Sequence, residues 1–208
     1  VLLEKMPGKI PETLPAAVTD HLKLMPLEKA LQNIHKPDSN IDLRNARFRL
    51  KFEELFFIQL KILSLKNNRE NKFKGYPFTT VGYNFNTFYH KYLPFPLTDA
   101  QKKVLREIRK DMGRQIQMNR LLQGDVGSGK TLVALMSALI ALDNGYQACL
   151  MAPTEILAQQ HYASINRMIS GMGICTGLLT GSTKAAERSD IHSKLLSGEM
   201  QILIGTHA

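Results

Sequence analysis

An eight-residue stretch, Gly124–Thr131, constrains the fold of this chain more than any other feature. Its letters GDVGSGKT fit the phosphate-binding loop pattern, two glycines separated by four residues and followed by Lys and Thr. The glycines let the backbone approach a polyphosphate closely, because no Cβ stands in the way. Lys130 places a cation on the outer phosphates, and Thr131 is placed to offer its hydroxyl to Mg²⁺. We therefore predict a nucleoside triphosphate site with Lys130 and Thr131 as catalytic residues and Thr131 as the metal ligand.

The segments on either side of the loop support this interpretation. Leu121 and Leu122 precede it as a strand would, and the apolar run 132–136 follows it as a buried helix would. The amides and dipole at the start of such a helix favour an anion. The structural alternative is a glycine-rich turn that binds nothing, and it does not explain this context.

After the loop, apolar runs of two kinds alternate along the chain. Short runs bounded by Gly or Pro predict strands, and longer amphipathic runs predict helices. Strands alternating with helices imply right-handed crossovers and a parallel sheet, so the fold class is α/β with a phosphate-binding loop. The expected strands are 147–152, 174–179 and 201–204, and the expected helices are 154–165 and 185–196.

Small polar residues follow each of these strands. Pro153-Thr154, Gly181-Ser182 and Gly205-Thr206 all stand at strand ends, on the rim that also carries the phosphate loop. Ligands of such sheets bind beyond the carboxyl ends of the strands. Singly, each pair fits a helix cap or a turn. Together they predict a polynucleotide track, because hydroxyls and free amides contact phosphates without reading base sequence.

Composition limits the partners. The net charge of +9 favours a polyanion over a membrane, although a basic balance is often only a solvated surface. The longest mostly apolar run, residues 132–142, is too short to span a bilayer. Cys149 and Cys175 lie in apolar runs without metal-ligand spacing, so we expect buried core thiols in a reducing compartment, with a disulfide or a metal site as the less favoured alternative.

The residues before the loop predict a mainly helical connector. Prolines limit residues 1–40 to short helices. Residues 42–66 lack Gly and Pro and are apolar over more than half of a helical wheel, so we expect this helix to be clasped on more than one side. Its basic residues allow two interpretations, contact with nucleic acid phosphates or a solvated or carboxylate-paired face. These residues are Arg44, Arg47, Arg49 and Lys51.

Two further features before the loop also keep two interpretations each. The aromatic-rich segment 67–96 is expected to pin an irregular linker to the neighbouring domain, and stacking of unpaired bases is the less favoured alternative. Thr98 and Gln101 fit a capping box at the start of a helix. Gln101 is also a candidate for reading the edge of a nucleotide base, and the sequence does not separate these two roles.

With these residues identified, the chain resembles the RecG-type, branch-migrating DNA helicases of superfamily two. The resemblance extends over nearly the whole chain. A transcription-repair coupling translocase shares the phosphate loop and residues 205–207 equally well but fits the other segments less well. The segments that carry the resemblance are 30–37, 46–50, 93–101, 118–131, 151–161, 179–182 and 205–208.

The resemblance implies a RecA-like motor domain that uses ATP and Mg²⁺ and moves on double-stranded DNA. Its substrates would be branched DNA such as stalled forks and Holliday junctions. It implies a bacterial cytosolic, nucleoid-associated protein, typically monomeric, with single-strand-binding protein as a candidate partner and no membrane contact. The expected organisation is a connector at 1–40 after a wedge domain whose tail falls in residues 1–11, a long helix and aromatic linker at 41–96, and the first part of the motor domain at 97–208.

The family's site residues carry over by position. Adenine would be read by Gln101. The phosphates and Mg²⁺ would be bound by Gly124, Asp125, Val126, Gly127, Ser128, Gly129, Lys130 and Thr131. DNA would be bound by Pro153, Thr154, Gln159, Gly181, Ser182 and Thr206.

One departure from the family concerns hydrolysis. The acidic box that would hold Mg²⁺ and orient water is expected shortly after Ala208, as are the second motor domain and its arginine finger. The sheet is thus expected to be incomplete at its C-terminal end, and these 208 residues alone to bind nucleotide weakly and hydrolyse it negligibly. Two other classes are alternatives, a non-catalytic DNA-binding fragment and a small-molecule phosphotransferase, whose arginine-bearing lid the sequence does not show.

Overall fold

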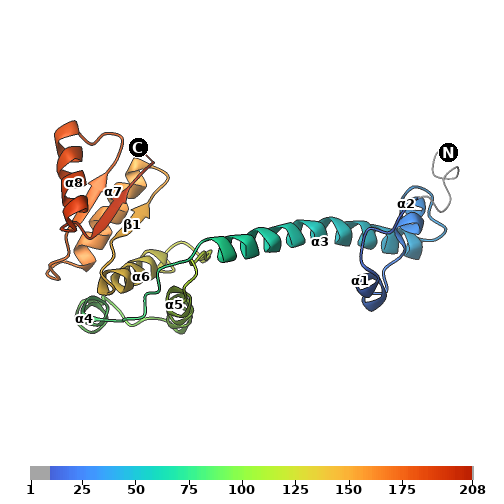
Figure 1. Ribbon diagram of the computed structural model, residues 1–208, viewed down its shortest axis with the longest axis horizontal. Helices are drawn as coiled ribbons and strands as arrows, with labels where there is room; N and C mark the ends of the chain where they lie inside the picture. The colour runs from blue at the N-terminus through green and yellow to red at the C-terminus, as the bar shows by residue number, and fades with distance from the viewer. Residues whose placement is uncertain (1–9, 208) are drawn as a thin grey trace. The chain divides into compact units, whose positions relative to one another are not determined.

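The computed structural model describes residues 10–207, and Figure 1 shows its elements along the chain. These residues form two compact units, one ending at Lys72 and the other beginning at Phe73. The first unit is helical, and the second contains the sheet. Most of the segment in which we expect the tail of a wedge domain, residues 1–11, lies outside the described residues.

The first unit contains three helices, α1 (Ala16–His21), α2 (Leu27–His35) and α3 (Asn40–Lys72). Pro15 and Pro26 stand directly before α1 and α2, where the fixed φ of proline suits entry into a helix. Helix α2 packs against α3, and its buried residues include Ala30. The short helices separated by prolines agree with the sequence expectation.

The long helix α3 is less covered than the sequence predicts. Ala46 and Arg49 are its buried residues, while Leu55 and Leu63 are about three-fifths exposed. A helix of 33 residues is roughly 50 Å long, and the short α2 reaches only part of it. The described residues of the first unit therefore do not supply the expected clasp on more than one side. The large apolar side chains of α3 that stay exposed are Ile41, Phe48, Leu55, Phe57, Ile58, Leu60, Ile62, Leu63 and Leu65.

Arg49 ties the parts of the first unit together. Its side chain is fully buried, Nη1 donates to Glu53 Oε2 at 2.6 Å, and Nη2 donates to Glu12 Oε1. Glu12 Oε2 also accepts the amide of Leu27 at 3.0 Å, at the start of α2. Burial acts to raise the pKa of Glu12, but the amides of Leu14 and Leu27 and the Arg49 guanidinium outweigh it and leave the pKa below its ordinary value. Arg49 is thus carboxylate-paired, as one of the two interpretations held.

The second unit is an α/β layer structure. Its three strands are parallel and follow the order β1-β3-β2, which confirms the expected fold class. Figure 1 shows α7 and α8 beside the strands, and contacts join α7 to β2 and β3. Helix α6 is almost wholly buried and fills the core next to β1. The elements are α4 (Tyr83–Thr87), the π-helical turn η2 (Phe88–Tyr92), α5 (Asp99–Met112), α6 (Lys130–Asp143), β1 (Ala148–Met151), α7 (Glu155–Met168), β2 (Thr176–Leu179), α8 (Ala185–Ser197) and β3 (Ile202–Gly205).

The strand expected at Leu121–Leu122 does not form. This segment pairs with no strand among residues 10–207, and Leu121 is 89% exposed. A strand needs a neighbour to bond its amides and carbonyls, and no described strand lies beside this segment. Arg120 instead holds it to α5, since the guanidinium donates to Glu107 at 2.8 Å and to Asp111 at 2.5 Å.

The aromatic segment is not the irregular linker that we expected, because residues 83–92 are helical and belong to the second unit. The carboxylate of Asp143, the last residue of α6, accepts the amides of Gly82, Asn84 and Phe85 at 2.8–3.1 Å. The bonds from Asn84 and Phe85 satisfy two amides in the first turn of α4, which a helix cannot satisfy itself, and the bond from Gly82 holds the residue before the helix. Phe88 is fully buried in the core, so the expected anchoring role holds for that ring.

The two cysteines are less buried than we expect from the sequence. The side chain of Cys149 is exposed and that of Cys175 is half-buried, so only partial burial is found where we expected core thiols. Cys149 lies on β1, which is an edge strand of the described sheet and has a neighbouring strand on one side only. Residues 10–207 contain no group of His, Cys, Asp and Glu that could hold a metal ion. No helix within that range is both long and apolar enough to cross a bilayer.

Candidate nucleotide and nucleic-acid site

The phosphate loop leads directly into α6. Gly129 stands immediately before the helix with φ of +83°, and Gly127 has φ of +82°. These left-handed conformations suit glycine and strain other residues. A Cβ at Gly124 would lie 2.7 Å from Ser128 Oγ, so a larger residue there would require the Ser128 side chain to move. The loop therefore has the small, bent backbone that close approach to phosphates requires.

Lys130 is held inside this loop. Its ammonium donates to the carbonyl oxygens of Gly124 and Asp125, both at 2.7 Å. Next to it, a hollow of about 350 Å³ lies between the loop and the start of α5. This volume falls within the usual range for small-molecule sites. Gln101 and four of the predicted phosphate-binding residues line this hollow, and those four are Gly124, Asp125, Ser128 and Lys130.

Gln101 joins α5 to the loop. Its Oε1 accepts the amide of Thr98 at 3.0 Å, and Thr98 Oγ1 accepts the amide of Gln101 at 3.2 Å, which completes the predicted capping box. Its Nε2 also donates to the carbonyl of Ser128 at 2.9 Å. The sequence did not indicate this third bond, because Gln101 and Ser128 are 27 residues apart. We call the bond from Gln101 to Ser128 the latch. The cap of α5 and the latch therefore both depend on the buried side-chain amide of Gln101.

Gly129 offers a direct test of the latch. An alanine there would place its Cβ 2.4 Å from Gln101 Nε2, in a left-handed conformation that costs roughly 1 kcal/mol for a residue with a Cβ. We expect Gly129→Ala to weaken nucleotide binding at least about tenfold, which is a loss of roughly 1.4 kcal/mol. Titration with a fluorescent nucleotide measures this.

The matched control is Gly145→Ala. Gly145 has φ of +80°, and a Cβ there meets nothing within 4 Å. The Gly145→Ala variant has the same backbone strain without a steric clash. Its melting temperature should therefore fall, while its nucleotide affinity stays unchanged. Equal affinity losses in the two variants would show that the Gln101 latch does not matter for the loop.

The predicted DNA-contacting residues follow aligned strand ends. Met151 of β1 and Leu179 of β2 both pair with Gly205 of β3, so the chain leaves all three strands at one level. Thr154 caps α7 by accepting the amide of Leu157 at 3.3 Å, and the amide of Thr206 donates to Leu179 at 3.1 Å. We call this edge the rim. The predicted residues that follow the strands are Pro153, Thr154, Gly181, Ser182 and Thr206. The remaining predicted residue, Gln159, lies in the second turn of α7.

Sequence reasoning did not foresee what Glu155 does on the rim. Its carboxylate accepts both the amide and the hydroxyl of Ser182 at 3.0 Å. It thereby fixes the loop after β2 against the start of α7. From the sequence, an acidic residue in the first turn of a helix indicates only that its charge stabilises the helix dipole. It does not indicate a bond to a distant loop. The carboxylate also sets a negative charge beside the predicted phosphate track.

The phosphate loop and the rim share one end of the sheet. Helix α6 ends at Asp143, β1 begins at Ala148, and the two elements are in contact. So short a connection reverses the chain, and the N-terminus of α6 lies towards the carboxyl ends of the strands. This is the usual place for ligands in such sheets.

Comparison with known proteins agrees with these observations. The sequence profile described as DEAD/DEAH box helicase matches residues 98–208. A Synechocystis sp. protein named ATP-dependent DNA helicase RecG is 42% identical over 97% of this chain and 24% of its own length. The Streptococcus pneumoniae protein of the same name is 43% identical over 96% of this chain and 29% of its own length.

A solved structure also matches over nearly the whole chain. It shows RecG bound to a three-way DNA junction, with a TM-score of 0.83 and 41% identity, and it covers 95% of this chain and 27% of that chain. The chain thus spans about a quarter of the length of the relatives it matches. These findings confirm the resemblance to RecG-type helicases that the motifs indicated.

Proposed function

This chain belongs to the DEAD/DEAH box helicase family, and we propose that the whole protein is an ATP-dependent DNA helicase that remodels branched DNA. The observation that carries the proposal is the shared edge of the sheet, where a phosphate loop and a row of strand-end hydroxyls and amides lie together. The likeness to RecG proteins supports the choice of branched DNA as substrate. Stalled forks and Holliday junctions are the proposed targets.

ATP is the proposed fuel, and the loop residues fit it. The glycine cradle leaves room for phosphates, and Lys130 carries the charge that complements them. The hydroxyl of Thr131, at the first turn of α6, is the proposed Mg²⁺ ligand. A bound Mg²⁺ neutralises charge that develops on the phosphates. This chain's own part is to bind the triphosphate and hold it in position at the N-terminus of α6.

Gln101 has hydrogen-bonding capacity left for adenine. A side-chain amide offers two N–H donors and an oxygen with two lone pairs. The latch to Ser128 uses one donor, and the bond from Thr98 uses one lone pair. One donor and one lone pair remain, which is the combination that reads the N6 and N7 edge of adenine. We therefore propose that Gln101 caps α5, latches the loop and reads the base together.

A variant pair tests this role. In Gln101→Ala the preference for ATP over GTP should disappear, a change of roughly tenfold because a bidentate amide–adenine contact discriminates by about 1–3 kcal/mol. Thr98→Ala, which breaks only the capping box, should keep the preference. Competition of ATP and GTP against a fluorescent nucleotide measures both. If Thr98→Ala lost the preference as fully as Gln101→Ala, the base-reading role would be wrong.

The rim is proposed to hold the DNA backbone. Thr154, Ser182 and Thr206 offer hydroxyls and amides that suit phosphate oxygens without sequence preference. Glu155 keeps the Ser182 loop in place, so its role is to position the contact rather than to bind DNA. Movement of the rim against a second motor domain, driven by ATP, would advance the protein along the duplex.

Cellular context completes the proposal. The relatives named above are bacterial DNA helicases, which supports action on DNA in the nucleoid of a bacterial cytosol. We propose that the protein works as a monomer and meets single-strand-binding protein where forks expose single strands. The experiment that tests the motor function separates DNA affinity from ATP use, and Lys130 is the residue to change.

A further inference from the structure

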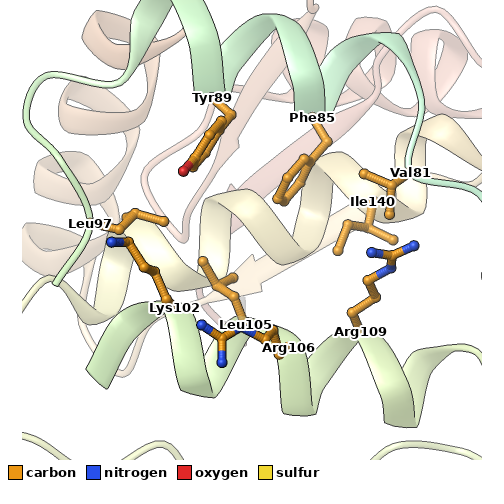
Figure 2. A pocket seen from close by; sticks show the side chains of 9 residues that line it. All are labelled: Val81, Phe85, Tyr89, Leu97, Lys102, Leu105, Arg106, Arg109 and Ile140. Atoms are coloured by element: carbon orange, nitrogen blue, oxygen red, sulfur yellow. The ribbon is translucent and has the colours of Figure 1, made fainter. Parts of the chain in front are cut away.

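A second hollow lies on another face of α5 from the nucleotide site. Its volume is about 280 Å³, and Figure 2 shows the side chains that surround it. From α5 it is lined by Lys102, Leu105, Arg106 and Arg109, which share one helical face. Gln101 faces the phosphate loop instead. The two hollows therefore have different walls. We call the second one the aromatic cavity.

The aromatic cavity is positively charged. Three of its lining residues are cations and none is a carboxylate. Lys102 lies 3.5 Å from the exposed Asp99, whereas Arg106 and Arg109 make no ion pair with any residue in 10–207. Figure 2 shows Arg109 reaching from α5 towards Ile140 and Val81. Two guanidinium groups are thus available for an anion, and Arg binds phosphate through two parallel hydrogen bonds.

The opposite wall is aromatic. Phe85 and Tyr89 stand one helical turn apart, their ring planes differ by 7°, and their centroids are 6.4 Å apart. Figure 2 shows both rings pointing across the cavity towards α5. Tyr89 lies in the π-helical turn η2 and is 39% exposed. Such turns occur frequently at functional sites. Two nearly parallel rings therefore form this wall.

Apolar residues form the floor of the cavity, and hydrogen bonds hold the start of its aromatic wall in place. Leu97, Leu105 and Ile140 are at most 6% exposed. Asp143 holds the start of α4 through three amide bonds, so the aromatic wall is fixed to the same helix that supplies Ile140. The apolar floor and the start of the aromatic wall are therefore fixed parts of the second unit, while Arg106 and Arg109 line the cavity from the exposed side of α5.

These features select one kind of ligand. Flat aromatic faces and an apolar floor suit a planar ring, and the arginines suit a phosphate next to that ring. A volume of about 280 Å³ is below that of usual drug-sized sites and suits one base rather than a whole triphosphate. We propose that the aromatic cavity captures one unpaired base of a DNA strand, with Arg106 and Arg109 on the flanking phosphates. This contact goes beyond the proposed motor, since a duplex-tracking rim does not need it.

The test uses the full-length protein and a short single-stranded oligo-dT that carries one 2-aminopurine. Stacking against Phe85 and Tyr89 should quench the 2-aminopurine on binding to wild-type protein. Tyr89→Leu should remove the quench and weaken single-strand binding roughly tenfold, a stacking contact being worth about 1–3 kcal/mol. Tyr83→Leu is the matched control, because Tyr83 lies on the same helical segment, is 76% exposed and is not part of the cavity.

A second pair of variants tests the phosphate contacts without touching the rings. Arg106→Gln with Arg109→Gln should lower the slope of log K against log salt by about 1.4, the value for two phosphates of a single strand. Lys103→Gln with Lys110→Gln removes the same charge from α5 outside the cavity and should leave the slope nearly unchanged.

Three results would overturn the proposal. The first is an unchanged quench in Tyr89→Leu. The second is displacement of the strand by free dTMP as effectively as by the unlabelled oligonucleotide, which would indicate a site for free nucleotides. The third is a lower melting temperature in both cavity variants with unchanged DNA binding, which would indicate that another segment of the protein packs into the cavity.

Discussion

Replacing Lys130 by alanine in the full-length protein is expected to abolish ATP-driven unwinding of branched DNA while leaving DNA affinity intact. The ammonium of Lys130 lies inside the phosphate loop, 2.7 Å from two of its carbonyls, and is the cation nearest to the proposed phosphate position. Loss of one positioned charge of this kind lowers turnover roughly 100- to 1,000-fold. DNA affinity should change by no more than about twofold, because Lys130 is not on the rim and phosphate contacts dominate binding.

Lys103→Ala is the control for charge. It removes one positive charge from an exposed position of α5 and should leave both ATP hydrolysis and unwinding near wild-type rates. Hydrolysis is measured by phosphate release, and DNA affinity by anisotropy with a labelled three-way junction. If Lys130→Ala lowered DNA affinity as much as it lowered turnover, the loop would be a DNA contact, and the assignment as a motor would fail.

Replacing Arg49 by methionine is expected to cause the largest loss of stability in the first unit. Arg49 is fully buried and bonds both Glu12 and Glu53, so its removal leaves two carboxylates without their partner. Breaking a buried ion pair from one side costs about 3–5 kcal/mol, and the partial exposure of Glu12 places the expected loss near 3 kcal/mol. Urea unfolding of the 208-residue chain, followed by the helical circular dichroism signal, measures it.

Arg47→Met is the matched control, since Arg47 is exposed on the same helix and its replacement should change the free energy of unfolding by less than about 0.5 kcal/mol.

The destabilisation caused by Arg49→Met should also depend on pH. The pKa of Glu12 is lowered below 4.5, so its contribution is fully present above pH 4.5 and is lost as the pH falls through the lower folded-state pKa. A wild-type advantage that stayed constant down to pH 2 would contradict the role of the ion pair.

The nucleotide site shows how far local sequence patterns reach. The pattern of glycines, Lys130 and Thr131 predicted both the bend of the loop and the start of α6, because each depends on residues close in the chain. The capping box of Thr98 and Gln101 was predicted for the same reason. The latch from Gln101 to Ser128 was not, because it joins two segments that only the folded chain brings together.

The errors have the same origin. The strand expected at Leu121–Leu122 needs a neighbouring strand, and apolar letters alone do not supply one. Cys149 was expected in the core because its neighbours are apolar, yet β1 lies at an edge of the described sheet. The carboxylate of Asp143 caps α4 from 58 to 61 residues away, so the helical character of the aromatic segment was not readable from its own residues.

The sequence by itself determined the helices and strands that follow residue 130, the capped start of α5, and that a phosphate loop opens α6. Hydrogen bonds within a few residues and the period of apolar side chains set these features. Only the tertiary structure decided what each polar side chain does. Arg49 became a buried anchor, Glu155 the clamp on Ser182, and Phe85 with Tyr89 the wall of a cavity. These outcomes depend on long-range packing, which brings groups that are distant in the chain into contact.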